Sequence, residues 1–197
     1  MTLYIPKHFA GDDATARKLI AEHPFAALVT AAAEDVQVTH LPLLLDDSGD
    51  ALIGHVAKPN PHWRAFEQGE TTAIFHGPHA FVSRGWYENP ADNVPTWNYA
   101  TVHATGRPVL ADAAETRAAV ERLVARFEPP TLAPIAEAKL ERLLHGIVAF
   151  RMPIARLEVK FKMSQNKPPA DRAGVIRGLR KAGEDATVAW METHEPR

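Results

Sequence analysis

The feature that most restricts the fold of this chain is how its strand-like runs are separated. In the first half, apolar runs at residues 25–30, 36–45 and 51–57 are divided by short polar turns such as Asp46-Asp47-Ser48-Gly49-Asp50. Runs joined in this way are typical of β-hairpins. No regular alternation of strand and helix follows, so a doubly wound parallel sheet is not expected. We predict a mostly antiparallel sheet of six to eight strands, and closure into a small barrel would remove its edges.

Helices are expected between some of these strands, which gives a mainly β, α+β class. The clearest starts are Asn60-Pro61, which predicts a helix over 62–68, and Asp112 with Glu115, a capping box for a helix to residue 127. Further helices are expected at 12–23, 136–145 and 171–180, and further strands at 72–75, 79–83, 100–109, 147–152 and 156–163, with breaks at Gly77-Pro78 and Pro153. We expect one domain over residues 1–182 and a loose tail over 183–197.

Composition excludes several classes of protein. The chain has 197 residues and no cysteine, which excludes disulfides and thiolate chemistry. The formal charge of −2 gives no overall attraction to nucleic acid or anionic lipid. No apolar run approaches the roughly 20 residues of a membrane span, and residues 1–7 lack the features of a signal peptide. A cytoplasmic protein is expected, with no membrane partner.

Three stretches carry side chains suited to ligand binding. The first, Val94 to Tyr99, includes Trp97 and Asn98 and offers a flat ring beside hydrogen-bonding groups, as in a pocket for a planar ligand. Ordinary core aromatics would also explain it. The second, His55 to Trp63, brings Lys58 and Asn60 to a helix start, where a phosphate can bind, although a solvated lysine beside a common cap explains it equally.

The third stretch is Lys160 to Pro168, in which two lysines lead into Ser164, Gln165 and Asn166. Such groups bind phosphates and ring edges, but they also suit a polar strand exit. Among the ten histidines, His76 and His79 lack the set of three or four ligands usual for a metal, so no metal site is expected. No catalytic dyad, nucleophile motif or glycine-rich phosphate loop is present. The residues alone indicate a barrel that binds a phosphate-bearing aromatic ligand.

Several strings, taken in order over most of the chain, resemble the PaiB-like family of FMN-binding negative transcriptional regulators. They are Tyr4-Ile5-Pro6-Lys7-His8-Phe9, His23-Pro24-Phe25-Ala26, residues 39–46 (THLPLLLD), Gly54-His55-Val56-Ala57-Lys58, Asn60-Pro61-His62-Trp63, residues 75–80 (FHGPHA), Pro95-Thr96-Trp97-Asn98-Tyr99 and Met163-Ser164-Gln165-Asn166-Lys167.

The resemblance implies an antiparallel split β-barrel of the pyridoxamine-phosphate-oxidase type, in which a homodimer binds FMN between its subunits. The expected cofactor-binding residues are Thr39, His40, Leu41, His55, Val56, Ala57, Lys58, Asn60, Trp97, Asn98, Lys162, Gln165 and Asn166. His62 is a further candidate for the phosphate. The oxidases place an arginine and a lysine where this chain reads 39–44 without a cation, so Lys160, Lys162 or Arg172 would have to supply the charge.

The function implied is that of an FMN-binding homodimer that regulates transcription. Two alternatives stay open: a flavin-dependent oxidoreductase acting on a small molecule, and a haem-binding member of the same barrel superfamily. Direct DNA binding has little support in the sequence, because no helix-turn-helix is evident and the only basic cluster, 160–181, also suits a phosphate or dimer face. Whether the protein is an enzyme is undecided, since any redox chemistry would belong to the flavin.

Overall fold

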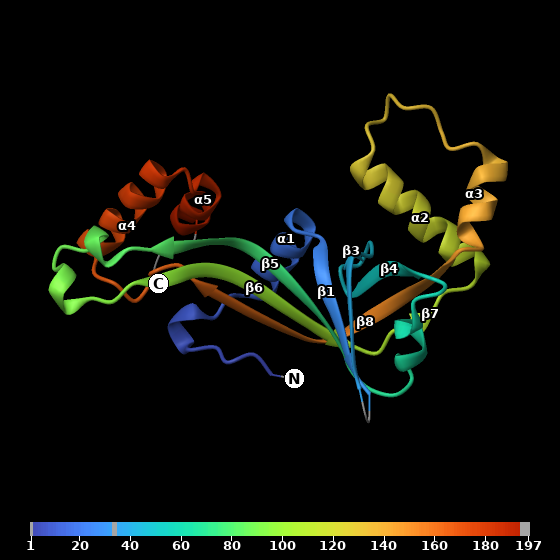
Figure 1. The fold of residues 1–197 in the computed structure, drawn as a ribbon, viewed down its shortest axis with the longest axis horizontal. Helices are drawn as coiled ribbons and strands as arrows, with labels where there is room; N and C mark the ends of the chain where they lie inside the picture. Colours follow the sequence, from blue (N-terminus) through green and yellow to red (C-terminus); the bar gives the residue numbers. More distant parts are fainter. Residues whose placement is uncertain (1, 33–34, 194–197) are drawn as a thin grey trace. The chain divides into compact units, whose positions relative to one another are not determined.

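The structure is a computed structural model that describes residues 2–32 and 35–193. Its strands are β1 (Phe25–Ala31), β2 (Val36–Pro42), β3 (Leu44–Leu45), β4 (Ala51–Ala57), β5 (Thr71–Val82), β6 (Thr96–Gly106), β7 (Val109–Leu110) and β8 (Ile147–Lys162). They are hydrogen-bonded in the order β2-β1-β5-β6-β8-β4-β3, with β7 added to β8 (Figure 1). The fold is an antiparallel eight-stranded sheet, as predicted.

The helices follow the predicted pattern with one clear exception. The α-helices are α1 (Asp13–Glu22), α2 (Ala113–Phe127), α3 (Glu137–Leu144), α4 (Pro169–Ala182) and α5 (Asp185–Thr193); the 3-10 helices are η1 (Lys7–Phe9), η2 (Pro61–Ala65), η3 (Arg84–Trp86) and η4 (Pro90–Asp92). The capping box of α2 is present, with the Asp112 carboxylate accepting from Glu115 N at 2.8 Å. The helix expected over 62–68 was wrong in kind: η2 is a five-residue 3-10 turn.

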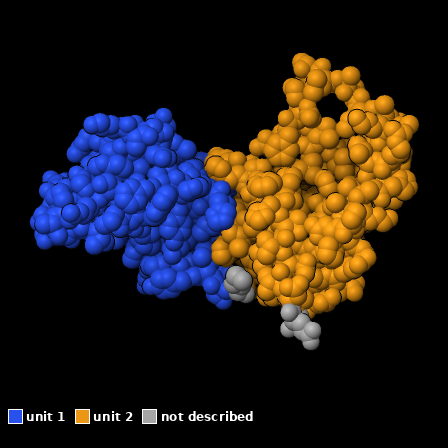
Figure 2. Space-filling model, in the orientation of Figure 1, with its two compact units in different colours: residues 1–19, 76–102, 158–197 blue, residues 20–75, 103–157 orange. Residues whose placement is uncertain are grey.

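The chain forms two compact units (Figure 2). Unit 1 comprises residues 1–19, 76–102 and 158–197, and unit 2 comprises residues 20–75 and 103–157. Strands β5, β6 and β8 each contribute residues to both units. The single domain expected over residues 1–182 stays a prediction.

Unit 2 holds the barrel, because the two ends of the strand order are joined in sequence. Strands β2 and β3 lie at opposite ends of that order, yet only Leu43 separates them in the chain. A Cβ on Gly54 in β4 would overlap the Leu43 side chain, so β4 passes close to this junction. Phe66 and Phe150 meet edge to face inside, with ring centroids 4.9 Å apart. The predicted split β-barrel is therefore confirmed.

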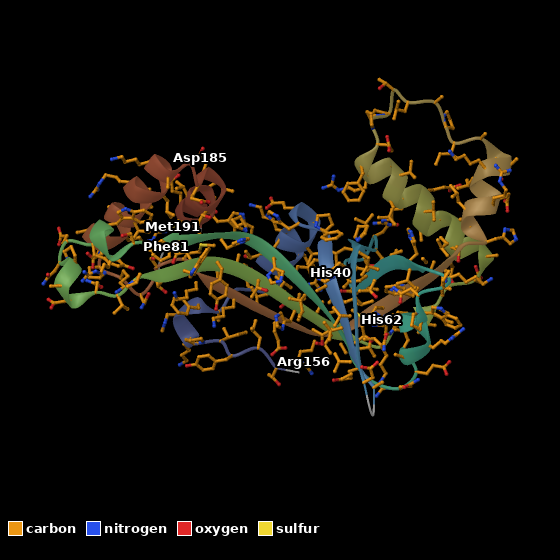
Figure 3. All side chains as sticks on the ribbon, viewed as in Figure 1. His40, His62, Phe81, Arg156, Asp185 and Met191 are labelled. Carbon is orange, nitrogen blue, oxygen red and sulfur yellow. The ribbon has the colours of Figure 1, made fainter. Side chains whose placement is uncertain are left out.

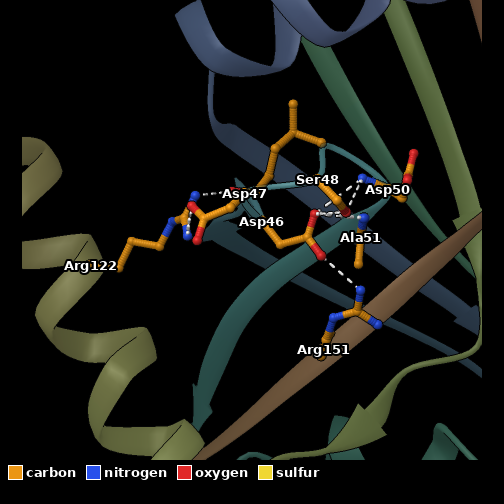
Figure 4. Close-up of polar contacts among 8 residues, drawn as sticks. Asp46, Asp47, Ser48, Asp50, Ala51, Arg122 and Arg151 are labelled. Carbon is orange, nitrogen blue, oxygen red and sulfur yellow. Dashed lines mark hydrogen bonds and ion pairs between the residues drawn. The ribbon is translucent and has the colours of Figure 1, made fainter.

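A polar corner fixes the β3–β4 hairpin of unit 2 (Figure 4). Asp46 accepts hydrogen bonds from Arg151 at 2.7 Å, from Ser48 at 2.9 Å and from the backbone of Asp50 and Ala51. Partial burial opposes ionisation of Asp46, but these donors outweigh it and lower its pKa to about 2. The carboxylate thus ties the turn after β3 to the neighbouring strand β8.

Unit 1 packs helices against one face of its strands. Phe161 of β8 meets Trp190 of α5, with ring centroids 5.3 Å apart, and a Cβ on Gly178 of α4 would overlap the Trp86 ring. The loose tail expected from residue 183 is contradicted over 185–193, because α5 buries Val188, Trp190 and Met191. Its apolar residues are few, but they are large enough to anchor the helix.

Two expected breaks in strands are absent, and one strand begins earlier than expected. Strand β5 runs through Gly77-Pro78. Its ladder with β1 ends at Phe75, so Pro78, which has no N–H to donate, interrupts no hydrogen bond between β5 and β1. Strand β8 runs through Pro153, which is where its pairing with β4 ends. Strand β6 begins at Thr96 rather than residue 100, so Trp97 and Asn98 belong to the strand itself.

Candidate functional site

A chain of polar side chains crosses the interior of unit 2 and fixes the place where β2 meets η2. Asn60 Nδ2 donates to Thr39 Oγ1 at 3.1 Å, and Thr39 Oγ1 lies 2.8 Å from His62 Nδ1. His62 Nε2 lies 2.9 Å from Thr30 Oγ1, which lies 2.7 Å from Thr71 Oγ1. Every member is satisfied if His62 is neutral with its proton on Nε2 and donates to Thr30. This network brings two predicted site residues, Thr39 and Asn60, into contact.

His62 does not face a ligand. Its side chain is fully buried and both ring nitrogens are engaged, so the expectation that it meets a phosphate was wrong. Figure 3 marks its position on the ribbon. Burial lowers the pKa of His62, which keeps the ring neutral. The anion site expected at a helix start is also weakened, because η2 has only five residues and the Asn60 side chain already caps His62 N at 3.0 Å. The imidazole is a structural hub.

Three features of unit 2 are not used by this network. Strand β2 is an end of the hydrogen-bonded order, so over residues 39–41 the backbone groups alternate between bonding to β1 and pointing to the outer edge. Lys58, at the end of β4, is exposed and forms no ion pair within residues 2–32 and 35–193. His55 Nδ1 is buried and has no hydrogen-bond partner in that same part of the chain. An edge, a cation and an unpaired ring nitrogen suit a polar-edged anionic ligand.

The strand positions explain which predicted residues can offer side chains. Along β2, Leu41 points inward and is 4 % exposed, whereas His40 is exposed and lies against Phe25, with ring centroids 6.4 Å apart. Along β4, Val56 is buried, while Ala57 and Lys58 reach the surface. Leu41 and Val56 can therefore contribute only backbone groups.

The other predicted residues lie in unit 1. Trp97 is 53 % exposed and meets Phe81 edge to face, with ring centroids 6.1 Å apart, so it is a surface ring rather than a core aromatic. Gln165 is committed locally, because its amide accepts from Met163 N at 2.7 Å and donates to Phe161 O at 2.6 Å. It shapes the turn after β8 and has little capacity left for a ligand.

Asn98, Lys162 and Asn166 come together at a pocket of about 140 Å³. Lys162 Nζ donates to Thr96 Oγ1 and, at 2.7 Å, to Trp97 O. Burial, and then the nearby charges of Lys160 and Lys167, lower the pKa of Lys162. The structure thus gathers the predicted residues into two groups, one in each unit.

The sequence analysis missed Tyr87 and Lys167, which also line this pocket. Lys167 lies in the stretch 160–168 and in the basic cluster 160–181 but is not among the expected cofactor-binding residues, and Tyr87 lies outside every predicted helix and strand. A Trp-Tyr pair followed by Asn-Pro was the available signal, since large aromatics in a loop usually anchor it. Histidines give no metal site: within the described ranges no three His, Cys, Asp or Glu side chains gather as a metal would need. No helix in those ranges is long and apolar enough to cross a membrane.

Known proteins are similar to this chain over most of its length. A family model described as "Putative FMN-binding domain" matches residues 3–156. The chain is 34 % identical over 186 residues to the Bacillus subtilis (strain 168) protein named "Protease synthase and sporulation protein PAI 2", covering 90 % of this chain and 89 % of the relative. It is 30 % identical over 218 residues to an uncharacterised protein of Emericella nidulans, covering 86 % and 87 %.

Among solved structures, the FAD and heme binding protein from Mycobacterium smegmatis superposes with a TM-score of 0.63 at 15 % identity. The match covers 79 % of this chain and 74 % of that one. At this identity the likeness concerns the fold alone.

Proposed function

Because this chain belongs to the family of FMN-binding domains whose model spans residues 3–156, we propose that it is a homodimeric flavoprotein that holds FMN at the β2 edge of unit 2. The observation that carries the placement is the link between Thr39 and Asn60, which joins the edge strand to the segment after β4. FMN needs hydrogen-bonding groups for its ring edge and a cation for its phosphate. The edge and Lys58 offer both.

The proposed role of each residue follows from which of its charged or hydrogen-bonding groups are not already used inside the protein. Backbone groups of Thr39, His40 and Leu41 meet the ring edge, and Lys58 meets the phosphate, with Asn60 fixed beside it by its cap and its bond to Thr39. His55 Nδ1 gains a partner when the cofactor binds, which relieves the cost of a buried unpaired nitrogen. When bound, FMN supplies the redox chemistry; the protein sets its position and polarity.

An exposed apolar face supports dimerisation. On the outer side of β1 and β2, Phe25, Val36 and Val38 are 63 %, 56 % and 53 % exposed. The register pairs Val29 with Val38 and Ala31 with Val36, so these side chains form one continuous patch. Such patches mark protein contacts. Since the same strand β2 carries the proposed flavin edge, a partner on this face would place FMN at the interface.

The family resemblance implies a regulatory role, and we propose that this regulation is indirect and does not require the protein to bind DNA itself. The formal charge is −2, which gives no general attraction to DNA. We expect regulation to act through the flavin state or a protein partner. A gel-shift assay on promoter DNA at two salt concentrations tests this: tight, salt-dependent binding by the protein alone would contradict it.

The experiment for FMN placement is a titration of purified protein with FMN, followed by absorbance and by quenching of flavin fluorescence. Lys58→Ala should weaken FMN binding about tenfold, as expected for loss of one charged hydrogen bond. The matched control is Lys139→Ala, an exposed lysine on α3 of the same unit, which should leave the affinity within a factor of about two. Equal affinities for the two variants would remove Lys58 from the site.

Light scattering on the same samples tests the shared interface. Val38→Glu places a charge in the apolar face and should reduce both dimerisation and FMN binding. A monomer that still binds FMN with unchanged affinity would contradict a site between subunits.

A further inference from the structure

The small pocket of unit 1 is a built site with its own chemistry. It encloses about 140 Å³ and is lined by Tyr87, Val94, Thr96, Asn98, Lys162, Ser164, Asn166 and Lys167. All these residues belong to unit 1, so the pocket is formed without any part of the barrel. The lining is polar except for Val94, and it contains two ammonium groups and no carboxylate.

The two lysines hold positive charge that the protein does not neutralise. Lys162 donates to the Thr96 hydroxyl and the Trp97 carbonyl, and Lys167 donates to Asn93 Oδ1 at 2.7 Å. All three partners are neutral, and neither lysine forms an ion pair in the part of the chain that the structure describes. The carboxylate of Asp171 acts on Tyr87 but accepts from Glu88 N at 2.8 Å and pairs with neither lysine. Two ammonium groups held near each other without an ion pair favour an anion between them.

A second observation points the same way. Tyr87 is 4 % exposed, and its Oη is buried without a hydrogen-bond partner among the described residues. The Lys167 ammonium lies 4.7 Å from the centre of the Tyr87 ring, and both residues line the pocket. Burial, and then the charge of Asp171, raise the pKa of Tyr87, so the phenol stays a donor. A buried donor without an acceptor is costly unless a ligand supplies one.

The turn beneath the pocket is held in place beforehand. Ser164 has a φ of 61°, a left-handed conformation that non-glycine residues rarely adopt. Its hydroxyl donates to Asn98 Oδ1 at 3.1 Å, and the two amide bonds of Gln165 fix the turn from the other side. Backbone strain of this kind is often kept at binding sites.

We propose that this pocket binds a small oxyanion, a phosphate or carboxylate group, held by Lys162, Lys167 and the Tyr87 hydroxyl. The volume suits a group of this size and excludes a flavin ring system. The inference stands apart from the FMN proposal, which rests on unit 2. It assigns Lys162, Asn98 and Asn166 to a ligand other than FMN.

Calorimetric titration of the full chain with inorganic phosphate, and separately with acetate, tests the pocket and distinguishes the two anions. Saturable binding of either supports it. Lys167→Gln and Tyr87→Phe should each weaken binding, the lysine by about tenfold and the phenol by about threefold to tenfold. The matched control is Lys160→Gln, which removes a nearby charge on β8 but no atom of the pocket lining. It should change affinity by less than about threefold.

Two results would overturn the proposal: no saturable binding of either anion, or an equal loss in Lys160→Gln and Lys167→Gln, which would indicate a general positive field. A third arm repeats the phosphate titration with FMN present. Displacement of phosphate by FMN would show one shared site and contradict a separate pocket. Thermal unfolding of each variant confirms that it is folded. The outcome is independent of Lys58→Ala, which tests FMN placement alone.

Discussion

Units 1 and 2 share three strands but satisfy their polar side chains in opposite ways. In unit 2, Thr39, His62, Thr30 and Thr71 bond to one another in a closed chain, and Thr72 pairs with Thr105 at 3.1 Å. In unit 1, Lys162 and Lys167 have neutral partners only, and Tyr87 Oη has none. Fully satisfied networks rigidify a fold, whereas groups left open cost stability and mark places for ligands.

The outer surfaces of the two units also differ in chemical character. The β1–β2 face of unit 2 exposes Phe25, Val36 and Val38, an apolar surface that suits contact with another protein. The outward side of unit 1 carries Phe81 and Trp97, and its Lys160 ammonium lies 5.5 Å from the Tyr99 ring. A cation over an aromatic ring is attracted to the ring face, so unit 1 has a mixed aromatic and cationic surface where unit 2 has an apolar one. In unit 2 the buried network fixes the fold, and the proposed FMN edge and partner face lie on its surface, whereas in unit 1 the open polar groups line the proposed oxyanion pocket.

The largest expected effect tests the closed network. His62→Leu removes the hub and leaves the hydroxyls of Thr39 and Thr30 buried without their ring partners. We expect a loss of about 3 kcal/mol of unfolding free energy, measured by urea denaturation. The control is His79→Leu, an exposed histidine of unit 1, which should change stability by less than about 0.5 kcal/mol. Similar losses in both would break the contrast between the units.

The next largest effect concerns the packing of α4 against η3 in unit 1. A Cβ on Gly178 would overlap the Trp86 ring, so Gly178→Val must push η3 away from α4. We expect about 2 kcal/mol of destabilisation from overpacking. The control is Ala170→Val on the exposed side of the same helix, which should cost about 0.5 kcal/mol. A Gly178→Val variant as stable as that control would show that the contact matters little.

The fold could be predicted from sequence because hairpin turns and caps are local signals. Asp46 to Asp50 marked the β3–β4 turn, and Asp112 with Glu115 marked the start of α2. The failures came from tertiary context. Gly77-Pro78 and Pro153 looked like breaks, but each falls where a neighbouring strand has already ended, and sequence does not show where a ladder stops.

The candidate site was less predictable, because a motif does not reveal which side chains are already used. His62 and Gln165 belong to strings that suggested ligand contacts, yet both spend their polar atoms inside the protein. Trp97 could not be assigned to core or surface before its strand direction was known, and it proved exposed. Tyr87 reaches the pocket only through long-range packing that no local pattern encodes.

A smaller effect concerns Asp46, the charged residue of the polar corner at the β3–β4 hairpin of unit 2. Asp46 has a pKa near 2 when folded and an ordinary carboxyl pKa when unfolded, so its contribution is present above about pH 4 and is lost as pH falls toward 2. Asp46→Asn should cost about 1 kcal/mol at pH 7 and less at pH 3, after allowing for solvent screening. Asp47→Asn is the control, because that side chain is 95 % exposed and its pair with Arg122 should contribute little.

The smallest effect concerns His55, whose ring nitrogen is buried without a hydrogen-bond partner although the other polar side chains described above for unit 2 are paired. His55 has an unpaired buried Nδ1, and burial lowers its pKa, so the folded protein favours the neutral ring. The unfolded chain takes up a proton below about pH 6.5, so His55 lowers stability as pH falls from there toward its folded pKa. His62 adds to the same slope.

His55→Gln should therefore flatten the fall in unfolding free energy between pH 7.5 and 5.5 by on the order of 0.5 kcal/mol, whereas His145→Gln, an exposed histidine, should leave it unchanged. FMN sharpens the test. If the cofactor gives His55 Nδ1 a partner, adding FMN should change this slope in the wild type but not in His55→Gln. An identical FMN response in the two proteins would mean that the unpaired His55 nitrogen does not meet the ligand, and unit 2 would then keep one buried polar group that neither the protein nor FMN satisfies.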